Sequence, residues 1–344
     1  MQAITIHSAK DLRLKDSAAG EPGKGEVRIA MATGGICGSD LHYYNHGGFG
    51  PVRLREPMIL GHEVSGYVDA IGAGVTKVKT GDLVAINPSR PCVDCVYCTR
   101  GHFNQCLNMR FYGSAMPFPH VQGAFRQSLI ADEIQCEIVA SGVSAGEAAM
   151  AEPFSVCLHA VRQAGELRGT RVLIAGCGPI GALCIIAAKQ AGAAEIIASD
   201  LSDKALEFAM RIGADRTVNV SSGGEAFSLY TRDKGYFDIC IEASGSAQSL
   251  QSALAVVRPR GIIVQVGLGG EMTVPMNLLV SKEINLKGSF RFHEEFAQAV
   301  QLINSGAIDL KPLITATLPM TDAVEAFELA SDRTRAMKVQ LDFS

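Results

Sequence analysis

Short runs of alternating apolar and polar residues fill the first third of the chain. Residues 3–7 and 26–31 are rich in β-forming side chains, and the glycine-rich stretch 20–25 between them is typical of a turn. Residues 58–68 alternate in the same way and are followed by further turn-forming residues at 72–74 and 79–82. We therefore expect a small, irregular, strand-rich domain over roughly the first 140 residues.

The pattern changes near residue 145, where an alanine-rich run predicts a helix up to Pro153 and a second helix through His159 to Ala164. Strands then alternate with helices. Strands are expected at 171–175, 195–199, 216–220, 237–242, 261–266 and 283–287, and helices at 182–190, 203–212, 224–233 and 246–257. This alternation predicts a doubly wound parallel sheet. Two helices at 296–304 and 323–330 and a strand at 336–341 are too few for a domain, so this tail is expected to return to the first one.

Length and charge limit the possible functions. The 344 residues favour about two domains. With 47% hydrophobic residues, 19% charged residues and a net charge of -4, the chain has no basic surface for nucleic acid or for a membrane. Its apolar runs stay below the roughly 18 residues that a membrane span requires. The first residues show no secretory pattern, so we expect a cytoplasmic protein.

Four of the ten cysteines are clustered, at positions 92, 95, 98 and 106. In a reducing compartment such a cluster indicates a metal site rather than disulfides. Cys92, Cys95, Cys98 and Cys106 can form one closed tetrahedral zinc site, which is structural because no position stays open. Such a site contributes roughly 10 to 16 kcal/mol to the folding of its segment. His102 lies inside this lobe, residues 90–107, and is expected to be a surface residue.

A second candidate metal site combines Cys37, in a glycine-rich loop that begins a helix, with His62 and Glu63. Thiolate, imidazole and carboxylate are the three ligand types that zinc accepts, and three protein ligands leave a fourth position for water or substrate. That arrangement predicts a catalytic zinc. The alternative is three unrelated side chains, since single cysteines are usually buried as small apolar residues.

Gly176, Gly178 and Gly181 follow the strand expected at 171–175 and precede a helix, which is the context of a dinucleotide-binding turn. Asp200, which ends the next strand, is placed to hydrogen-bond the adenosine ribose. Its charge would repel a 2'-phosphate, so NAD is favoured over NADP, although Lys204 could weaken that preference. The alternatives are a plain glycine turn and a helix-capping aspartate.

In this order along one chain, the motifs resemble the zinc-dependent medium-chain dehydrogenases, and Glu152 in place of a cysteine resembles their polyol dehydrogenase branch. The resemblance implies an α/β fold. A GroES-like, strand-rich catalytic domain would span 1–145 and 293–344, and a Rossmann NAD-binding domain 146–292, with the active site in the cleft between them. It also implies two zinc ions per chain and a homodimer or homotetramer.

The resemblance further assigns roles to individual residues. Ser39 would take the substrate proton and His42 would form the outer end of the proton relay, while Glu152 would contact zinc directly or through water. Cofactor contacts are expected at Gly176, Gly178, Pro179, Ile180, Gly181, Asp200, Lys204, Val266, Gly267, Leu268, Ser289, Phe290 and Arg291. Substrate contacts are expected at Tyr43, Phe111, Glu152 and Arg291.

Residues 86–89, 108–121 and 288–292 resemble members of the branch that act on a sugar acid, so the resemblance implies oxidation of L-idonate at its fifth carbon to 5-ketogluconate. A neutral polyol such as sorbitol or xylitol is the alternative substrate. A noncatalytic, zinc-stabilised nucleotide-binding protein is an alternative of another class. It predicts an incomplete zinc triad or a broken proton relay, whereas Cys37, Ser39, His42, His62 and Glu63 are all present.

Overall fold

The computed structural model describes residues 1–223 and 225–344, which form two compact units. The first unit comprises Met1–Glu152 and Phe296–Ser344, and the second comprises Pro153–Glu295. Within the described residues, every helix is too short or too polar to cross a membrane.

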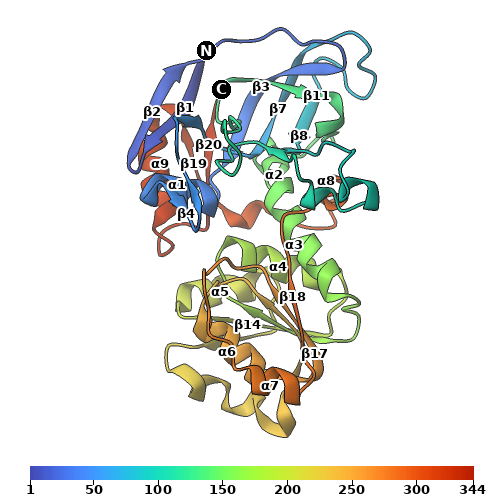
Figure 1. The fold of residues 1–344 in the computed structure, drawn as a ribbon, viewed down its shortest axis with the longest axis vertical. Coiled ribbons are helices and arrows are strands. Elements are labelled where there is room, and N and C mark those ends of the chain that lie inside the picture. The colour runs from blue at the N-terminus through green and yellow to red at the C-terminus, as the bar shows by residue number, and fades with distance from the viewer. The chain divides into compact units, whose positions relative to one another are not determined.

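A seven-stranded sheet dominates the first unit (Figure 1), in the order β12-β8-β7-β3-β20-β19 with β11 also paired to β3. The central strand β3 (Glu26–Gly35) alternates buried and half-buried residues, as a strand with one face on the core does. The other strands are β7 (Glu63–Ile71), β8 (Leu83–Ile86), β11 (Ser128–Asp132), β12 (Cys136–Ile138), β19 (Ile314–Pro319) and β20 (Lys338–Asp342). Smaller sheets join β1 (Gln2–Ser8) with β2 (Asp11–Asp16) and β6 (Met58–Ile59), β4 (Gly48–Phe49) with β5 (Val52–Arg53), and β9 (Ser89–Arg90) with β10 (Arg110–Phe111).

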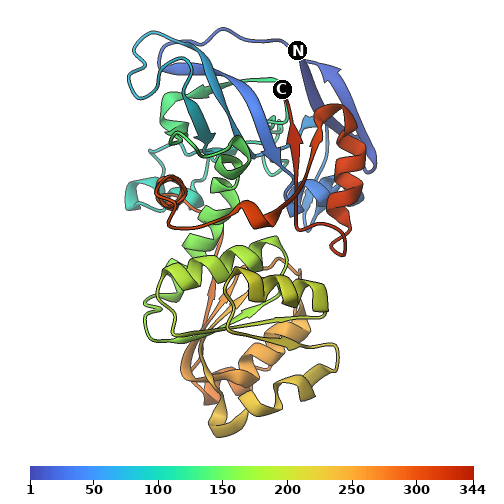
Figure 2. The same ribbon diagram turned by 180° about the vertical axis from the view of Figure 1, so that it is seen from behind.

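The C-terminal tail completes the sheet of the first unit. After α8 (Glu295–Asn304), the tail forms β19, helix α9 (Ala323–Ser331) and β20. Residues 340–342 of β20 pair antiparallel with residues 33–35 of β3, and Figure 2 shows these C-terminal strands beside the N-terminal ones. The end of β3, which leads directly into the loop of Cys37, is therefore held by strands from both ends of the chain. β19 is absent from the expected elements because its short run is only half-buried.

The second unit is a six-stranded parallel sheet in the order β15-β14-β13-β16-β17-β18. Its strands are β13 (Arg171–Ala175), β14 (Glu195–Asp200), β15 (Arg216–Asn219), β16 (Phe237–Glu242), β17 (Val257–Gln265) and β18 (Asn285–Gly288). Helices α4 (Pro179–Gln190) and α5 (Asp203–Ile212) lie on one face, and α6 (Ala247–Val256) and α7 (Met276–Ser281) on the other (Figure 1). The strand order reverses direction beside β13, as in a Rossmann fold, which confirms the predicted fold class.

Two helix predictions are wrong in detail. The break expected at Pro153 lies earlier, between α2 (Ala145–Ala149) and α3 (Ala151–Ala164), because Pro153 sits in the first turn of α3, where its missing N–H is not needed. The α-helix expected at 224–233 is replaced by the 3-10 helices η4 (Gly223–Tyr230) and η5 (Arg232–Lys234). Gly223 and Asp233 have positive φ angles of 73° and 51°, which an α-helix does not allow. Further 3-10 turns are η1 (Cys98–Arg100), η2 (Phe103–Gln105), η3 (Glu133–Gln135), η6 (Lys311–Leu313) and η7 (Met320–Asp322).

Candidate zinc and dinucleotide sites

Cys37, His62 and Glu63 meet in the interior of the first unit. One ligand atom from each lies within 4.8 Å of the other two. Cys37 is the N-cap of helix α1 (Gly38–His46), Glu63 is the first residue of β7, and His62 directly precedes it. His62 and Glu63 are 5% and 1% exposed, whereas Cys37 is half-buried, so solvent reaches this donor set only from the side of the thiol. Sulfur, nitrogen and oxygen donors at this spacing suit a zinc ion.

Asp40 ties the two ligand-bearing segments together. Its Oδ2 accepts a hydrogen bond from the Cys37 N–H at 3.0 Å, and its Oδ1 accepts one from the Gly61 N–H at 3.2 Å. Oδ1 also lies 3.9 Å from His62 Nδ1, a buried nitrogen that has no hydrogen-bond partner among the described residues. A buried imidazole nitrogen in this state is one that a metal ion can satisfy. Sequence analysis missed Asp40, although it stands three residues after Cys37, in the capping-box position of α1.

Lys338 adds a positive charge that sequence analysis also missed. Its Nζ donates to Glu63 Oε1 at 2.9 Å, to Oε2 at 2.7 Å and to the Ile36 carbonyl at 3.3 Å. Although burial alone would lower it, the Glu63 carboxylate raises the pKa of Lys338. The buried ion pair therefore offsets one negative charge of the donor set, and each Glu63 oxygen keeps a lone pair for a metal.

Burial also changes the acidity of the neighbouring groups. It raises the pKa of Cys37 to about 12, with the Glu63 charge as the second cause. The Lys338 charge and, to a smaller extent, a hydrogen bond with the Ser39 side chain partly offset this rise in the pKa of Cys37. Burial raises the pKa of Glu152, in the first turn of α3, to about 8, while His62 acts in the opposite direction. A divalent cation beside these groups would favour their ionised forms. The negative groups gathered here are therefore the ligands of a metal ion more readily than neighbours in a metal-free core.

The two residues of the expected proton relay lie on one helix. Ser39 is half-buried beside Cys37, and His42 follows three positions later on the same face of α1, with an exposed side chain. Partial burial lowers the pKa of His42, and the charges of His46 and Arg333 lower it further. The neutral imidazole, which can accept a proton, is therefore favoured.

The two aromatic residues expected to contact substrate, Phe111 and Tyr43, lie in different surroundings. The ring of Phe111 lies 5.4 Å from that of His62, next to the candidate catalytic zinc site. Tyr43 is 2% exposed, its ring packs 5.6 Å from Phe49, and its hydroxyl accepts a hydrogen bond from the Ala115 N–H at 3.0 Å. Tyr43 thus contributes to the hydrophobic core of the unit.

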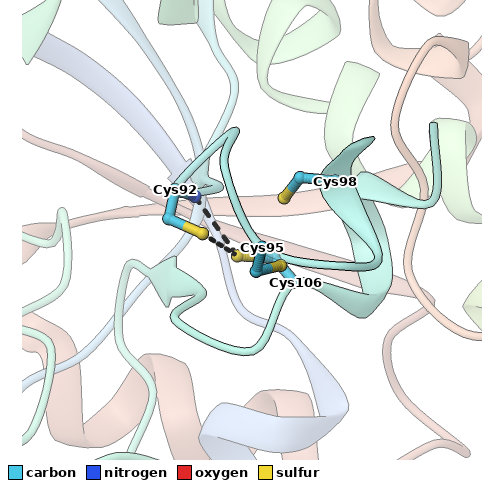
Figure 3. A group of neighbouring side chains, drawn as sticks. All are labelled: Cys92, Cys95, Cys98 and Cys106. Atoms are coloured by element: carbon cyan, nitrogen blue, oxygen red, sulfur yellow. Dashed lines mark hydrogen bonds between the residues drawn. The ribbon is translucent and has the colours of Figure 1, made fainter. Parts of the chain in front are cut away.

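The four clustered cysteines converge in one lobe (Figure 3), where their sulfurs all lie within 4.8 Å of one another. The Sγ atoms of Cys92 and Cys106 are 3.4 Å apart, close to the about 3.8 Å that two sulfurs take on a tetrahedral zinc. Backbone N–H groups of Cys98 and Leu107 lower the pKa of Cys95 to about 6, so this sulfur is prepared to bind as a thiolate. The donor set therefore fits a structural zinc.

The cysteine lobe is connected to the site of Cys37, His62 and Glu63 through the two strands that flank it. It links β9 to β10, which pair antiparallel with Ser89 opposite Phe111. Phe111 is the residue that packs against His62, so a metal that orders the lobe also fixes one wall of the other site.

The glycines of the dinucleotide motif form a tight turn at the end of β13. Gly176 has a φ of 93°, and a Cβ on Gly181 would lie 1.7 Å from the Gly176 carbonyl oxygen. The helix can therefore pack this closely against the turn only with glycine at position 181. Gly178 is the N-cap of α4 and Pro179 is its first residue, followed by Ile180. The start of this helix directs N–H groups outward, as diphosphate binding requires.

The remaining cofactor candidates surround the carboxyl ends of the strands. Asp200 Oδ2 accepts from the Cys177 N–H at 2.7 Å and Oδ1 from the Ser202 N–H at 2.9 Å, while Lys204 is exposed in the first turn of α5. Val266, Gly267 and Leu268 follow β17, and Leu268 is 74% exposed. Ser289, Phe290 and Arg291 follow β18; Arg291 has a positive φ of 54°, and its guanidinium lies 4.9 Å from the Phe290 ring.

A strand-rich unit with two zinc-type donor sets, joined to a Rossmann unit with a dinucleotide turn, defines a zinc-dependent alcohol dehydrogenase of the medium-chain type. Residues 23–141 match the family model of the alcohol dehydrogenase GroES-like domain, and residues 179–305 match that of the zinc-binding dehydrogenases. The chain belongs to this family. The family and the enzyme class expected from the sequence are therefore confirmed.

The chain is similar to named dehydrogenases of L-idonate and of sorbitol. It is 46% identical to the L-idonate 5-dehydrogenase (NAD(P)(+)) of Escherichia coli strain K12 over 92% of this chain and 91% of that protein. It is 37% identical to the sorbitol dehydrogenase of Gallus gallus over 98% of this chain and 95% of that protein. The crystal structure of L-idonate 5-dehydrogenase from Escherichia coli superposes with a TM-score of 0.95 at 43% identity, covering 99% of this chain and 97% of that one.

Proposed function

We propose that this protein oxidises the C5 hydroxyl of L-idonate to the ketone of 5-ketogluconate and reduces NAD to NADH, with release of one proton. The observation that carries the proposal is the clustered set of Cys37, His62 and Glu63 in a chain similar to a named L-idonate 5-dehydrogenase over most of its length. The noncatalytic alternative lacks support, because no member of the expected zinc set or proton relay is missing.

In this proposal Cys37, His62 and Glu63 hold the catalytic zinc, and Glu152 lies beside them. Zinc, when bound, supplies a Lewis acid that lowers the pKa of the substrate alcohol. Ser39 accepts the hydroxyl proton and His42 passes it to solvent, which its lowered pKa permits. Lys338 holds the Glu63 carboxylate in place through its two hydrogen bonds.

NAD, when bound, accepts the hydride. The turn from Gly176 to Gly181 holds its diphosphate and Asp200 its adenosine ribose, while Val266–Leu268 and Ser289–Arg291 carry the nicotinamide. The Asp200 carboxylate favours NAD, because a 2'-phosphate would bring a second negative charge against it.

We further propose a second, structural zinc on Cys92, Cys95, Cys98 and Cys106, and a cytoplasmic location, where a chain with ten cysteines keeps its thiols reduced. A homodimer or homotetramer is the expected assembly. The end strand β18 supports it, because residues 285–288 are exposed and its outer backbone groups can pair with a second copy. Light scattering on the purified protein tests the assembly, and a monomer would contradict it.

A neutral polyol is the second candidate substrate, favoured by the similarity to a named sorbitol dehydrogenase. NAD reduction by the zinc-loaded protein should be followed in parallel with L-idonate, D-gluconate, sorbitol and xylitol at equal concentration. A strong preference for L-idonate supports the sugar-acid proposal, since a site built for a carboxylate loses binding when its cation is left unpaired. Equal or faster turnover of sorbitol would replace it with the polyol activity.

A further inference from the structure

Glu242 is a fully buried carboxylate at the carboxyl end of β16, outside both candidate zinc sites. It is 0% exposed and accepts four hydrogen bonds. Oε1 accepts from the Ser244 N–H at 3.0 Å and from the Ser244 hydroxyl, and Oε2 accepts from the Gly245 N–H at 3.0 Å and from Gln265 Nε2. All four donors are neutral. Burying a carboxylate in this way is favourable only if its acceptor sites are used, so the four bonds act as one unit.

The turn Ser244–Gly245, which Glu242 holds, lies in close contact with the segment after β17. A Cβ on Gly267 would lie 2.2 Å from the Gly245 nitrogen, and one on Gly269 would lie 1.8 Å from the Gly245 oxygen. The Glu242 carbonyl also accepts from the Val266 N–H at 2.8 Å and from the Gly267 N–H at 2.9 Å. The same residue therefore fixes residues 266–268 twice, through its main chain and through the Ser244–Gly245 turn.

The diphosphate turn depends less on Glu242. Ser244 also touches Gly176, where a Cβ would meet it at 2.9 Å. However, Gly176 has its own anchor, because its N–H donates to the Ser199 carbonyl at 2.8 Å. The next residue, Cys177, is held by Asp200 at 2.7 Å. Loss of the Glu242 carboxylate should therefore release residues 266–268 before it releases the glycine turn.

We propose that Glu242 is a positioning residue that holds Val266–Leu268 in the conformation that receives the nicotinamide. The inference rests on the proposed function, which gives these three residues their role. Its four bonds place Gly245 against Gly267, and Gly245 in turn sets the position of the exposed Leu268. The adenosine and diphosphate half of the cofactor is bound by groups that Glu242 does not contact.

The test is Glu242→Gln, which keeps the shape but leaves one acceptor oxygen where four donors converge. NADH binding is measured by its fluorescence, and binding of ADP-ribose, which lacks nicotinamide, by calorimetry. We expect the Kd for NADH to rise roughly tenfold or more, about 1.4 kcal/mol per factor of ten, and the Kd for ADP-ribose to stay within about threefold. An equal loss for both ligands would mean a general structural role, and unchanged NADH binding would mean no role; either result overturns the proposal.

Two further variants keep the test decisive. Glu195→Gln makes the same change at the amino end of β14, where Glu195 accepts from the Tyr236 hydroxyl at 2.6 Å. It should leave the affinities for NADH and for ADP-ribose unchanged. Ser244→Ala removes one of the four donors to Glu242, together with the acceptor of the Ser246 N–H at 3.1 Å. It should weaken NADH binding in the same direction by a smaller factor, and it provides the test if Glu242→Gln fails to fold. A wild-type protein that binds NADH but turns over none of the sugar acids or polyols would refute the proposed function and leave this comparison of binding intact.

Discussion

Lys338 Nζ lies 2.7 Å from Oε2 of Glu63 and 2.9 Å from Oε1, although the two residues are 275 positions apart in the chain. Both side chains are almost completely buried, beside Cys37 and His62. The last strand of the chain, β20, thus brings a cation to a site whose expected ligands all come from the first 63 residues. The antiparallel pairing of β20 with β3 is what delivers it.

Lys338→Met should destabilise the metal-free protein by roughly 3 to 5 kcal/mol, because it leaves the Glu63 carboxylate buried without a countercharge. With zinc bound the loss should be smaller, since the metal then supplies positive charge. Urea unfolding with and without a chelator measures both values.

The control for that change is Lys77→Met, which removes an exposed lysine paired with Glu137 at 2.8 Å and should cost about 1 kcal/mol or less. If Lys338→Met cost no more than this control in the metal-free protein, the buried pair would not be needed to offset Glu63.

The sequence predicts what local spacing encodes. Cys37, the pair His62 and Glu63, and the four cysteines of the lobe lie in short segments whose residue types suit zinc, and the structure brings each set together. Lys338 could not be found this way, because its role depends on a strand pairing across most of the chain. The role of Asp40 could have been predicted from the sequence, since Asp40 follows Cys37 at capping-box spacing.

One error comes from a rule that is right on average. Pro153 predicts a helix end, yet proline is equally compatible with the first turn of a helix, which is where it lies. Tyr43 follows the metal segment and is expected to face substrate, but the three-dimensional packing places its hydroxyl on the Ala115 N–H. The substrate assignment of Tyr43 therefore stays a prediction.

Cys37→Ser should abolish turnover while NADH still binds, because the cofactor candidates all lie in the other compact unit. We expect a fall of roughly a thousandfold or more, about 4 kcal/mol of activation free energy, and one zinc per chain instead of two. Steady-state kinetics and metal analysis check this. Cys136→Ser, at a buried thiol away from both clusters, is the control; retained turnover in Cys37→Ser would refute the catalytic zinc.

Cys98→Ser should affect folding more than chemistry. A structural zinc site contributes roughly 10 to 16 kcal/mol to its segment, so loss of one ligand should lower the melting temperature and release one zinc. Thermal unfolding followed with metal analysis measures this. His102→Ala, an exposed histidine of the same lobe, should behave as wild type. A fully stable Cys98→Ser protein with two zinc ions would contradict the structural role.

Glu295 should make stability depend on pH in the acid range. Although burial acts in the opposite direction, hydrogen bonds from His159 Nδ1 at 3.0 Å and from the His293 N–H at 2.9 Å lower the pKa of Glu295 to about 2. Its pKa is lower in the folded than in the unfolded protein, so its stabilisation is complete above about pH 5 and is lost as the pH falls towards 2. Glu295→Gln should therefore be roughly 2 to 3 kcal/mol less stable than wild type at pH 7, and this gap should close in acid. A gap that is constant between pH 7 and pH 3 would contradict the stabilisation of the Glu295 carboxylate by these hydrogen bonds.

Asp200 should decide which cofactor is used. Its carboxylate stands between the glycine turn and the start of α5, where it accepts from the Cys177 and Ser202 N–H groups, and Lys204 is exposed in the first turn of α5. Asp200→Ala removes the charge that repels a 2'-phosphate and should shift the ratio of kcat/KM values from NAD towards NADP by roughly tenfold or more, about 1.4 kcal/mol. Asp203→Ala, which removes a neighbouring carboxylate bonded to Asn219, should leave the ratio unchanged. Adding Lys204→Ala to Asp200→Ala should cancel part of this shift towards NADP, because Lys204 can bind the 2'-phosphate in the single variant and is missing in the double variant. An equal loss with both cofactors would mean that Asp200 only supports the turn, and the preference for NAD would then have to come from other residues.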